Sequence, residues 1–397
     1  MVEYAQSKRQ SCLQPPSVSN RCFAADCAYF TVSAQRHVKY AIRAGAARFF
    51  PDGRLCHIFM AIWQNQSKMK SSPEDVMRDF QINGNDAGQR VDKFLTKAVP
   101  LLPQSMLYKA IRTKRIKLNG KRCEISTRLC AGDQLTLYLN DSFFDSRDGA
   151  FSFLRSPAAI DILYEDENIL LVNKPAGLVV HEDEHQSSDT LINRIQHHLY
   201  NCGVYNPAEE NSFAPALCNR IDRNTAGIVI AAKNAAALRI LNEKIKAREL
   251  QKLYLCIVHG TMPKESDTLK AFLRKDARTN TVAVYDHPIP DGRTILTHYR
   301  VVAQKGRLSL LEIDLLTGRT HQIRAHLAHI GHPLLGDAKY GRNRDNHKTG
   351  LKHQALCAYK LTFHFQSDAG ILNGLNGRTF EIPKVWFRDA FFAGTLY

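Results

Sequence analysis

The amino-acid sequence predicts an α+β protein in which a small α/β unit precedes a larger unit with a mixed, mainly antiparallel sheet. Short apolar stretches with the alternation of strands are interspersed with segments of helical period. These segments do not follow the strict strand–helix–strand order of a doubly wound parallel sheet. An Asn-Gly pair also separates two extended segments, which is the strongest short-range signal for an antiparallel hairpin.

Length and charge narrow the class of protein. The chain has 397 residues, with 54 Lys and Arg against 38 Asp and Glu, for a net charge of +16. This size suggests two or three folded units. The positive excess favours a polyanionic partner such as nucleic acid, and a merely basic soluble protein is the alternative. No stretch approaches roughly 18 consecutive apolar residues, and no signal-peptide pattern is visible. We therefore expect a cytoplasmic protein without a membrane partner.

Residues 1–76 differ from the rest of the sequence. They hold four of the ten cysteines and show neither an amphipathic period nor a turn-bounded strand. No cysteine pair has C-x-x-C spacing, which argues against a zinc ribbon and for free thiols. Two interpretations of this region compete: a disordered arm, or a stretch upstream of the native start. We expect the functional protein to begin near Met77.

The small unit is expected over residues 77–140. Two short helices are predicted from their apolar faces, one with Phe94, Leu95 and Ala98, the other with Met106, Leu107, Ala110 and Ile111. Ser105 would cap the second helix. Asn119-Gly120 predicts a hairpin turn, and residues 135–139 alternate as a strand.

The small unit is strongly basic. Residues 86–140 carry 11 Lys and Arg against four acidic residues, and seven of the basic ones lie between Lys109 and Arg122. A charge run is often only a solvated face, but here it occupies one helix end and the adjoining hairpin. We favour RNA binding, since about six phosphate contacts would make the affinity strongly dependent on salt. The candidate contacts are Arg90, Lys109, Arg112, Lys114, Arg115 and Lys117.

A polar segment, residues 141–158, is expected to link this unit to a larger one over residues 159–397. Strands are predicted over residues 169–173, 227–231, 253–258 and 311–315. Leu238, Leu241 and Ile245 share one helix face, and Ile323, Leu327 and Ile330 share another. The second of these helices should end at Gly331.

Two segments carry candidate chemistry. Asp222 lies between Arg220 and Arg223 on a loop that leads into an apolar strand, a position typical of catalytic residues. An ordinary surface ion pair is the alternative. Residues 317–326 gather donors at a helix start, which suits phosphate or carboxylate. Four histidines follow there, but no HExxH pattern or acidic partner at ligand spacing accompanies them, so we expect no metal.

Both units resemble known families. Residues 86–140 are similar to S4-type RNA-binding domains in their two helices, the basic run KAIRTKRIKLNG and the turn AGDQL. The larger unit resembles the RluA/RluC-type pseudouridine synthases. The matching motifs are Asn173–His181, Asn219–Gly227, Lys252-x-Tyr254 through Gly260, Gly318–His326, Gly331–Asp337 and Tyr340-Gly341. Asn219 stands where the family usually has His, and Ala226 where it usually has Ser.

The resemblance implies a pseudouridine synthase core with a central cleft. It implies an enzyme that isomerises uridines in RNA, with large-subunit ribosomal RNA favoured by the S4-like unit and with no cofactor or metal. By resemblance, Asp222 is the nucleophile, Arg324 its partner and Tyr254 a residue that stacks on the target base. Arg220 would hold the displaced strand. The expected substrate contacts are Arg220, Lys174, Arg319, His321 and Gln322.

Several alternatives stay open on the sequence alone. A non-catalytic RNA-binding or ribosome-assembly factor could use the same scaffold, although Asp222, Tyr254 and Arg324 together argue against it. A carboxylate-dependent hydrolase would need a second acid close to the first, and residues 217–227 supply none. The target uridine and the atom that Asp222 attacks, on ribose or on base, are open, and a monomer is the default expectation.

Overall fold

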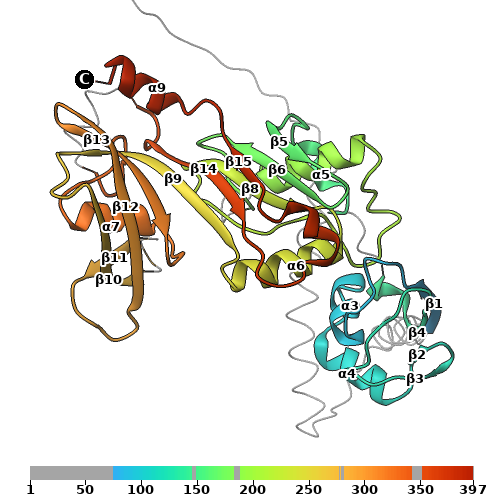
Figure 1. Cartoon of the computed structure of the whole chain (residues 1–397). Helices are drawn as coiled ribbons and strands as arrows, with labels where there is room; N and C mark the ends of the chain where they lie inside the picture. Colours follow the sequence, from blue (N-terminus) through green and yellow to red (C-terminus); the bar gives the residue numbers. More distant parts are fainter. Residues whose placement is uncertain are drawn as a thin grey trace, which may run out of the picture. The chain divides into compact units, whose positions relative to one another are not determined.

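The computed structural model of the chain (Figure 1) describes residues 75–144, 149–182, 188–276, 278, 281–341 and 351–396. The two interpretations of the N-terminal segment concern residues that lie almost wholly outside this part. Residues Pro73–Tyr397 form one compact unit. None of the helices in the described ranges is both long and apolar enough to cross a membrane. The cysteines within those ranges are free thiols, as expected.

The small basic unit is a four-stranded antiparallel sheet with two helices. Its elements are β1 (Asp75–Gln81), α3 (Val91–Ala98), α4 (Gln104–Arg112), β2 (Ile116–Leu118), β3 (Lys121–Arg122) and β4 (Gln134–Asn140), with strand order β1-β4-β2-β3. Phe94, Leu107 and Leu137 are among the side chains of its core. The predicted hairpin at Asn119-Gly120 is confirmed, and both residues have the positive φ that such a turn requires.

The start of α4 corrects two details of the prediction. Ser105 lies inside the helix, whose N-cap is Pro103, and no side chain caps it. The first turn is exposed to water, which can satisfy its free N–H groups without a capping side chain. Met106 is 45% exposed, because the buried face of α4 runs through Leu107, Ala110 and Ile111.

The large unit is built on one eleven-stranded sheet. Its main path runs β11-β10-β12-β13-β9-β14-β8-β6-β5, with β15 beside β14 and β7 beside β8. The strands are β5 (Ile162–Glu165), β6 (Ile169–Lys174), β7 (Ala216–Leu217), β8 (Ala226–Ala232), β9 (Leu250–His259), β10 (Ser266–Asp276), β11 (Thr281–Tyr285), β12 (Arg293–Lys305), β13 (Leu308–Leu315), β14 (Leu356–Phe363) and β15 (Thr379–Glu381). Among the strands that the structure describes, β8 and β14 are the only parallel pair, so the predicted mixed, mainly antiparallel sheet is confirmed.

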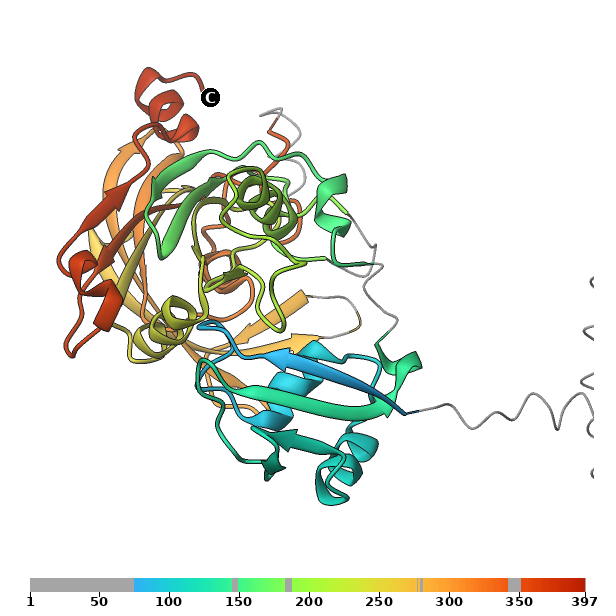
Figure 2. The same cartoon turned by 90° about the vertical axis from the view of Figure 1, so that its right-hand side faces the viewer.

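Helices cover both faces of the part of the sheet around β6 and β8 (Figures 1 and 2). Successive side chains of a strand point to opposite faces. Leu171 and Ile230 pack in one core with α6 (Ala235–Lys246), whereas Leu170 and Val229 pack in another with α5 (Leu191–Asn201). The remaining helices are α7 (Gln322–His329) and α9 (Trp386–Ala393), with short 3-10 turns η1 (Asp141–Phe143), η3 (Ser152–Arg155) and η4 (Gly370–Leu375). Within the expected linker, Phe153 of η3 is buried against α5.

The small and large units meet through a buried polar contact. Asp86 is fully buried and accepts hydrogen bonds from Asn211 Nδ2 at 2.7 Å and Ser212 Oγ at 2.6 Å. The neighbouring Glu210 accepts one from Asn85 Nδ2 at 2.7 Å. A carboxylate out of water needs such donors, so these side chains hold the start of the basic unit against the large unit.

Gly227 permits the close approach of β8 to β14. Its φ is +125°, and a Cβ there would collide with the backbone N and O of Ala358. The parallel pair joins Ala226 to Cys357 and Gly227 to Ala358. Because Ala358 also pairs with Tyr254 of β9, this contact brings the loop before β8 next to β9.

We expect Gly227→Ala to destabilise the large unit well beyond the ordinary cost of a positive φ. Gly203→Ala is the matched control, since Gly203 has φ +69° with open space around its Cβ position. The control should lower the free energy of unfolding by about 1 kcal/mol, and Gly227→Ala by about 3 kcal/mol or more, because backbone cannot move aside. Urea unfolding of both variants measures this, and equal losses would contradict the argument.

Candidate active site

Asp222 lies on the loop between β7 and β8, and its side chain is 25% exposed. The loop is closed by a hydrogen bond from Thr225 N to Asp222 O at 3.1 Å. Asn219 Oδ1 accepts from Ile230 N at 2.8 Å, so this side chain attaches the start of the loop to β8. The loop is therefore fixed at both ends while the carboxylate still reaches solvent.

Arg324 of α7 joins two carboxylates. Its Nε and Nη2 donate to Asp337 Oδ2 and Oδ1 at 2.7 and 2.9 Å, and its Nη1 donates to Asp222 Oδ2 at 3.0 Å. Asp337 is fully buried and Arg324 is 6% exposed. The bidentate pair fixes the plane of the guanidinium and directs its remaining donor to Asp222. The expected pairing of Asp222 with Arg324 is thus present in the geometry.

Burial and charge act against each other in this ion pair. Burial raises the pKa of Asp337, but the hydrogen bonds and charge of Arg324 outweigh this effect and hold that pKa below its usual value. Burial likewise lowers the pKa of Arg324, whereas both carboxylates raise it, with a net upward shift. Both groups are therefore charged at neutral pH, and neither could lose its partner without leaving a buried charge uncompensated.

Tyr254 of β9 lies near Asp222 in an apolar environment. It is 8% exposed and packs in a cluster with Ile323 and Leu327 of α7. Burial raises the pKa of Tyr254, and the charge of Asp222 raises it further, so the phenol keeps its proton. The arrangement places an apolar ring with one polar atom beside the carboxylate.

His321 also faces Asp222. Its Nε2 is 3.9 Å from Asp222 Oδ2, and its Nδ1 is 2.9 Å from Tyr340 Oη. The Arg324 guanidinium lies 5.2 Å from the centre of the Tyr340 ring. Asp337 and Tyr340 were not expected among the site residues, although both stand in the motif runs Gly331–Asp337 and Tyr340-Gly341, which were the available signal.

Lys174 supports the backbone of the site, whereas the sequence led us to expect that it contacts the substrate. Its side chain is fully buried, and Nζ donates to the carbonyl oxygens of Pro175, Leu178 and Arg223 at 2.7–2.9 Å. Burial lowers its pKa to about 7, and the charge of Asp222 opposes this shift. Three acceptors match an ammonium, which has three N–H groups, better than a neutral amine with two, so we describe Lys174 as charged. These hydrogen bonds connect Pro175 and Leu178 to Arg223, the residue after Asp222.

Gln322 is likewise occupied within the protein. Its Oε1 accepts from Thr317 Oγ1 at 2.9 Å and Arg319 N at 3.1 Å, and its Nε2 donates to Leu296 O and Thr297 Oγ1, both at 3.0 Å. Gln322 is 2% exposed. These contacts shape the turn before α7, so Gln322 orders this turn instead of reaching the cleft.

Two of the expected substrate contacts, Arg220 and Arg319, are exposed. Arg220 lies two residues before Asp222. Burial lowers the pKa of His181, and the charge of Arg220 lowers it further. Arg319 lies on the turn that leads into α7. Both remain available to a phosphate.

The four histidines near α7 do not converge on one point. His321 contacts Tyr340, His326 Nδ1 lies 3.0 Å from Thr297 Oγ1, and His329 Nε2 lies 2.7 Å from Asp286 Oδ1. His332 Nδ1 lies 3.0 Å from the carbonyl oxygen of His259. Among the residues that the structure describes, no group of His, Cys, Asp or Glu has the arrangement of a metal site.

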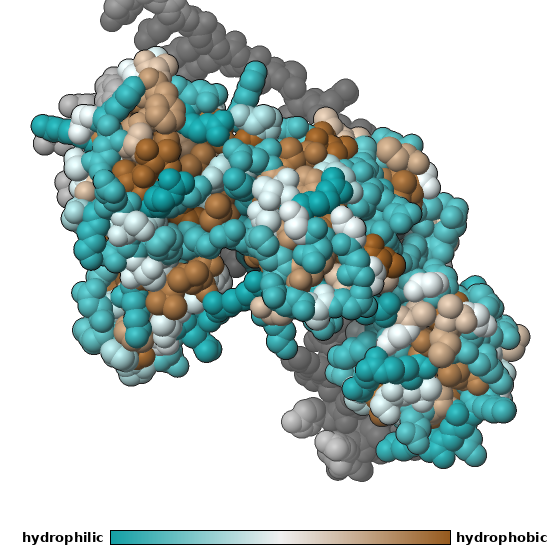
Figure 3. Space-filling view, in the orientation of Figure 1, coloured by the Kyte–Doolittle hydropathy of each residue, from teal (hydrophilic) through white to brown (hydrophobic). Residues whose placement is uncertain are grey.

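The expected RNA contacts of the small unit differ in their exposure and in their neighbours. Lys109, Arg112, Lys114 and Arg115 are exposed at the end of α4 and in the turn before β2. Lys117 is half-buried, with Nζ 5.1 Å from the centre of the Tyr138 ring. Arg90 is paired with Asp92 through two hydrogen bonds of 3.0 Å. Hydrophilic side chains cover much of this unit in Figure 3.

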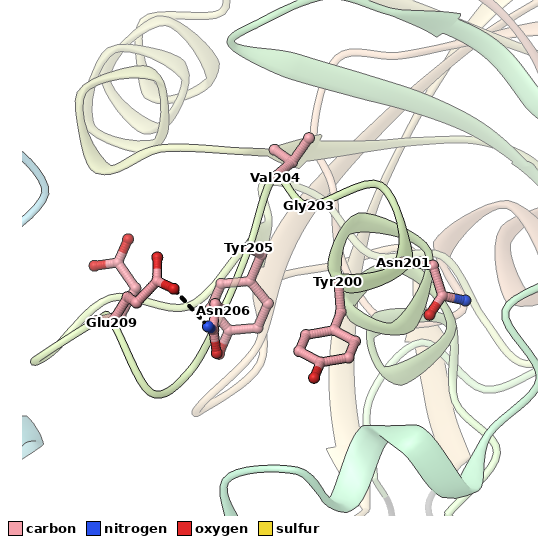
Figure 4. A pocket seen from close by; sticks show the side chains of 8 residues that line it. Tyr200, Asn201, Gly203, Val204, Tyr205, Asn206 and Glu209 are labelled. Atoms are coloured by element: carbon pink, nitrogen blue, oxygen red, sulfur yellow. Dashed lines mark hydrogen bonds between the residues drawn. The ribbon is translucent and has the colours of Figure 1, made fainter.

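A hollow of about 500 Å³ lies next to the end of α5 (Figure 4), and Asp222 is not among the residues that line it. Tyr200 and Tyr205 line it together with Glu209 and Glu210. Glu209 Oε1 accepts a hydrogen bond from Asn206 Nδ2 at 2.7 Å. Two carboxylates make this hollow unsuited to a phosphate backbone.

We expect Lys174→Met to disturb the position of Asp222 as well as to destabilise the fold. Lys244→Met is the matched control, because Lys244 is 2% exposed and donates to Ser367 and Glu249 on another side of the molecule. Each variant leaves buried acceptors without a hydrogen-bond donor and should lower the free energy of unfolding by about 3 kcal/mol. Only Lys174→Met should lower the turnover number of a reaction at Asp222, by about 100-fold, because it frees the Asp222 loop. An equal turnover in both variants would exclude this positioning role.

Comparisons with known proteins agree with this geometry. Residues 168–329 match the family model described as RNA pseudouridylate synthase, and residues 89–135 match the S4 domain. An uncharacterized RNA pseudouridine synthase of Mycoplasma genitalium is 35% identical over 298 residues, which cover 72% of this chain and 90% of the relative. The ribosomal large subunit pseudouridine synthases C of Buchnera aphidicola and Salmonella typhimurium are 34% and 31% identical, over 66% and 71% of this chain and 80% and 87% of their own lengths.

These matches confirm the resemblance seen in the motifs. They cover both the loop of Asp222 and the helix of Arg324, and the curated relatives match over most of their length. The chain belongs to the RNA pseudouridine synthase family and carries an S4 domain in front of its catalytic domain.

Proposed function

We propose that this enzyme isomerises specific uridines of large-subunit ribosomal RNA, with Asp222 as the nucleophile. The observation that carries the assignment of Asp222 is its position 3.0 Å from a guanidinium whose orientation Asp337 fixes. A nucleophile must be held in a defined position, and this guanidinium donates a directed hydrogen bond to the Asp222 carboxylate. The partly exposed side chain of Asp222 lets a flipped nucleotide reach it.

The surrounding groups suit a uridine that has left its stack. The apolar ring of Tyr254 offers a surface for the base, and its raised pKa keeps the hydroxyl protonated. Extruding a base from a helix costs a few kcal/mol, which bound phosphates must offset. Arg220 and Arg319 are exposed near the site and carry the charge for such contacts.

Ribosomal RNA is supported by two observations. The relatives from Buchnera aphidicola and Salmonella typhimurium are named ribosomal large subunit pseudouridine synthase C. The S4 domain presents Lys109, Arg112 and Lys114 as exposed cations on one helix end and the following turn. We propose that this patch binds RNA phosphates while the catalytic domain acts on the target, and that the enzyme works in the cytoplasm as a monomer. The domain limits are proposed as residues 77–140 and 159–397.

Asp222→Asn should abolish pseudouridine formation while RNA affinity stays nearly unchanged, because the amide keeps the shape but loses the nucleophile. We expect a loss of at least about 1000-fold in turnover. The control is Glu243→Gln, an exposed carboxylate of α6 outside the site. Pseudouridine mapping of total RNA from cells that lack the gene and carry each variant checks this. Full activity of Asp222→Asn would refute the nucleophile, and an unchanged map in cells without the gene would favour a non-catalytic RNA-binding factor.

Neutralising Arg112 and Lys114 together should flatten the salt dependence of RNA binding. Each lost phosphate contact reduces the slope of log affinity against log salt by about 0.7 to 0.9. The control is a double variant at Lys246 and Lys384, two exposed lysines of the catalytic domain. Fluorescence titrations of a ribosomal RNA fragment at several salt concentrations give both slopes. An unchanged slope in the first variant would show that the patch does not bind RNA.

A further inference from the structure

His321 has an unusual backbone conformation at the start of α7. Its φ and ψ are 53° and 19°, in the left-handed region. A residue with a Cβ adopts this region at a cost of about 1–2 kcal/mol, and such residues cluster at functional sites. Neither glycine nor asparagine, which tolerate the conformation best, occupies the position. The conformation sets the imidazole between Tyr340 and Asp222.

The partners of Tyr340 determine which nitrogen of His321 carries the proton. Tyr340 Oη accepts a hydrogen bond from Val282 N at 3.0 Å and lies 2.9 Å from His321 Nδ1. Burial raises the pKa of Tyr340, so the hydroxyl keeps its proton and can donate it to Nδ1. A neutral imidazole that accepts at Nδ1 carries its hydrogen on Nε2.

The electrostatics on the other side of the ring agree with this tautomer. Nε2 is 3.9 Å from Asp222 Oδ2, where an N–H is attracted and a lone pair would be repelled. Burial lowers the pKa of His321, and the charges of Arg324 and Lys339 lower it further against the opposing effect of Asp222 and Asp337. The ring is therefore neutral at pH 7.

We propose that Tyr340 holds His321 as its Nε2–H tautomer and that this neutral imidazole donates a hydrogen bond to the uracil ring while it is detached from ribose. This inference rests on the proposed function. When the bond between N1 and the ribose carbon breaks, its electron pair stays on the uracil, and negative charge spreads over N1 and the carbonyl oxygens. A fixed donor beside Asp222 stabilises that charge.

A neutral donor suits this step better than a cationic acid. Full transfer of a proton to N1 would leave a neutral uracil that is a poorer nucleophile at C5. The imidazole keeps its proton because its loss would produce an anion, so it stabilises the ring without neutralising it. The ring can then rotate and bond through C5 to the ribose carbon, displacing the Asp222 carboxylate that had taken the place of N1 there. C5 then releases its proton and N1 takes one up, so the product is an isomer of uridine.

The test uses two variants at His321 and one at Tyr340. His321→Gly removes the donor and accepts the left-handed backbone, so the fold should be kept, whereas His321→Asn keeps a shorter amide donor in a tolerated conformation. We expect His321→Gly to lower the turnover number by about 100- to 1000-fold, with the KM for RNA changed by less than about twofold. His321→Asn should recover part of that loss. Tyr340→Phe keeps the ring next to Arg324 but removes the hydroxyl, and it should lower the turnover number about tenfold.

Nitrogen NMR of the enzyme labelled at histidine reads the tautomer without any turnover. In the wild type the signals that disappear in His321→Gly should show an unprotonated Nδ1 and a protonated Nε2 between pH 7 and 8, and Tyr340→Phe should mix the tautomers. A protonated Nδ1 in the wild type, or a turnover of His321→Gly within about threefold of the wild type, would overturn the proposal. A wild type that makes no pseudouridine would overturn the proposed function and the donor role, whereas a defect confined to His321→Gly and Tyr340→Phe would leave the proposed function intact.

Discussion

The site depends on one guanidinium shared by two carboxylates. Asp337 is fully buried and binds two of the three guanidinium nitrogens of Arg324, which leaves the third, Nη1, directed at Asp222. A flexible arginine at a surface would provide charge without direction. Here the buried partner removes that freedom, because releasing either member would leave a charge uncompensated inside the protein. The position of Asp222 relative to its cation is thus a consequence of folding.

The backbone around this ion pair is also held in place, by buried hydrogen bonds and by one close contact between strands. Lys174 ties three carbonyl oxygens together, one of which belongs to the residue after Asp222. Gly227 lets β8 touch β14 where any Cβ would collide. Asn219, where the family usually has His, uses its amide oxygen to bind the N–H of Ile230. The departure at Asn219 therefore concerns the attachment of the loop, three residues before Asp222.

The proposed function divides the interaction with RNA between the S4 domain and the catalytic domain. The cations at the end of α4 are exposed, which suits contacts with many phosphates but little selection among bases. The contact between the two domains is polar and centres on the buried Asp86. A buried carboxylate that needs the donors of Asn211 and Ser212 favours one arrangement of the two domains over others, because a shifted arrangement would leave it without hydrogen bonds.

The sequence alone was sufficient for the class of fold, the main strands and helices and the family, because these follow from periodicity, turn residues and motifs of local spacing. It also singled out Asp222, Arg324, Tyr254 and His321, since each stands in a motif. It did not separate residues that face the cleft from residues that support it: Lys174 and Gln322 carry polar groups suited to a substrate, yet both are buried in contacts with backbone and neighbouring side chains.

Only the tertiary structure decided which groups meet. Asp337 and Arg324 are 13 residues apart and Asp222 is 102 residues from Arg324, so no local pattern reports their contacts. The hydrogen bond between Tyr340 and His321 and the left-handed backbone of His321 likewise depend on packing against β11 and α7. Local sequence determines which elements form, whereas the direction of a buried side chain is set by the partners that folding brings to it.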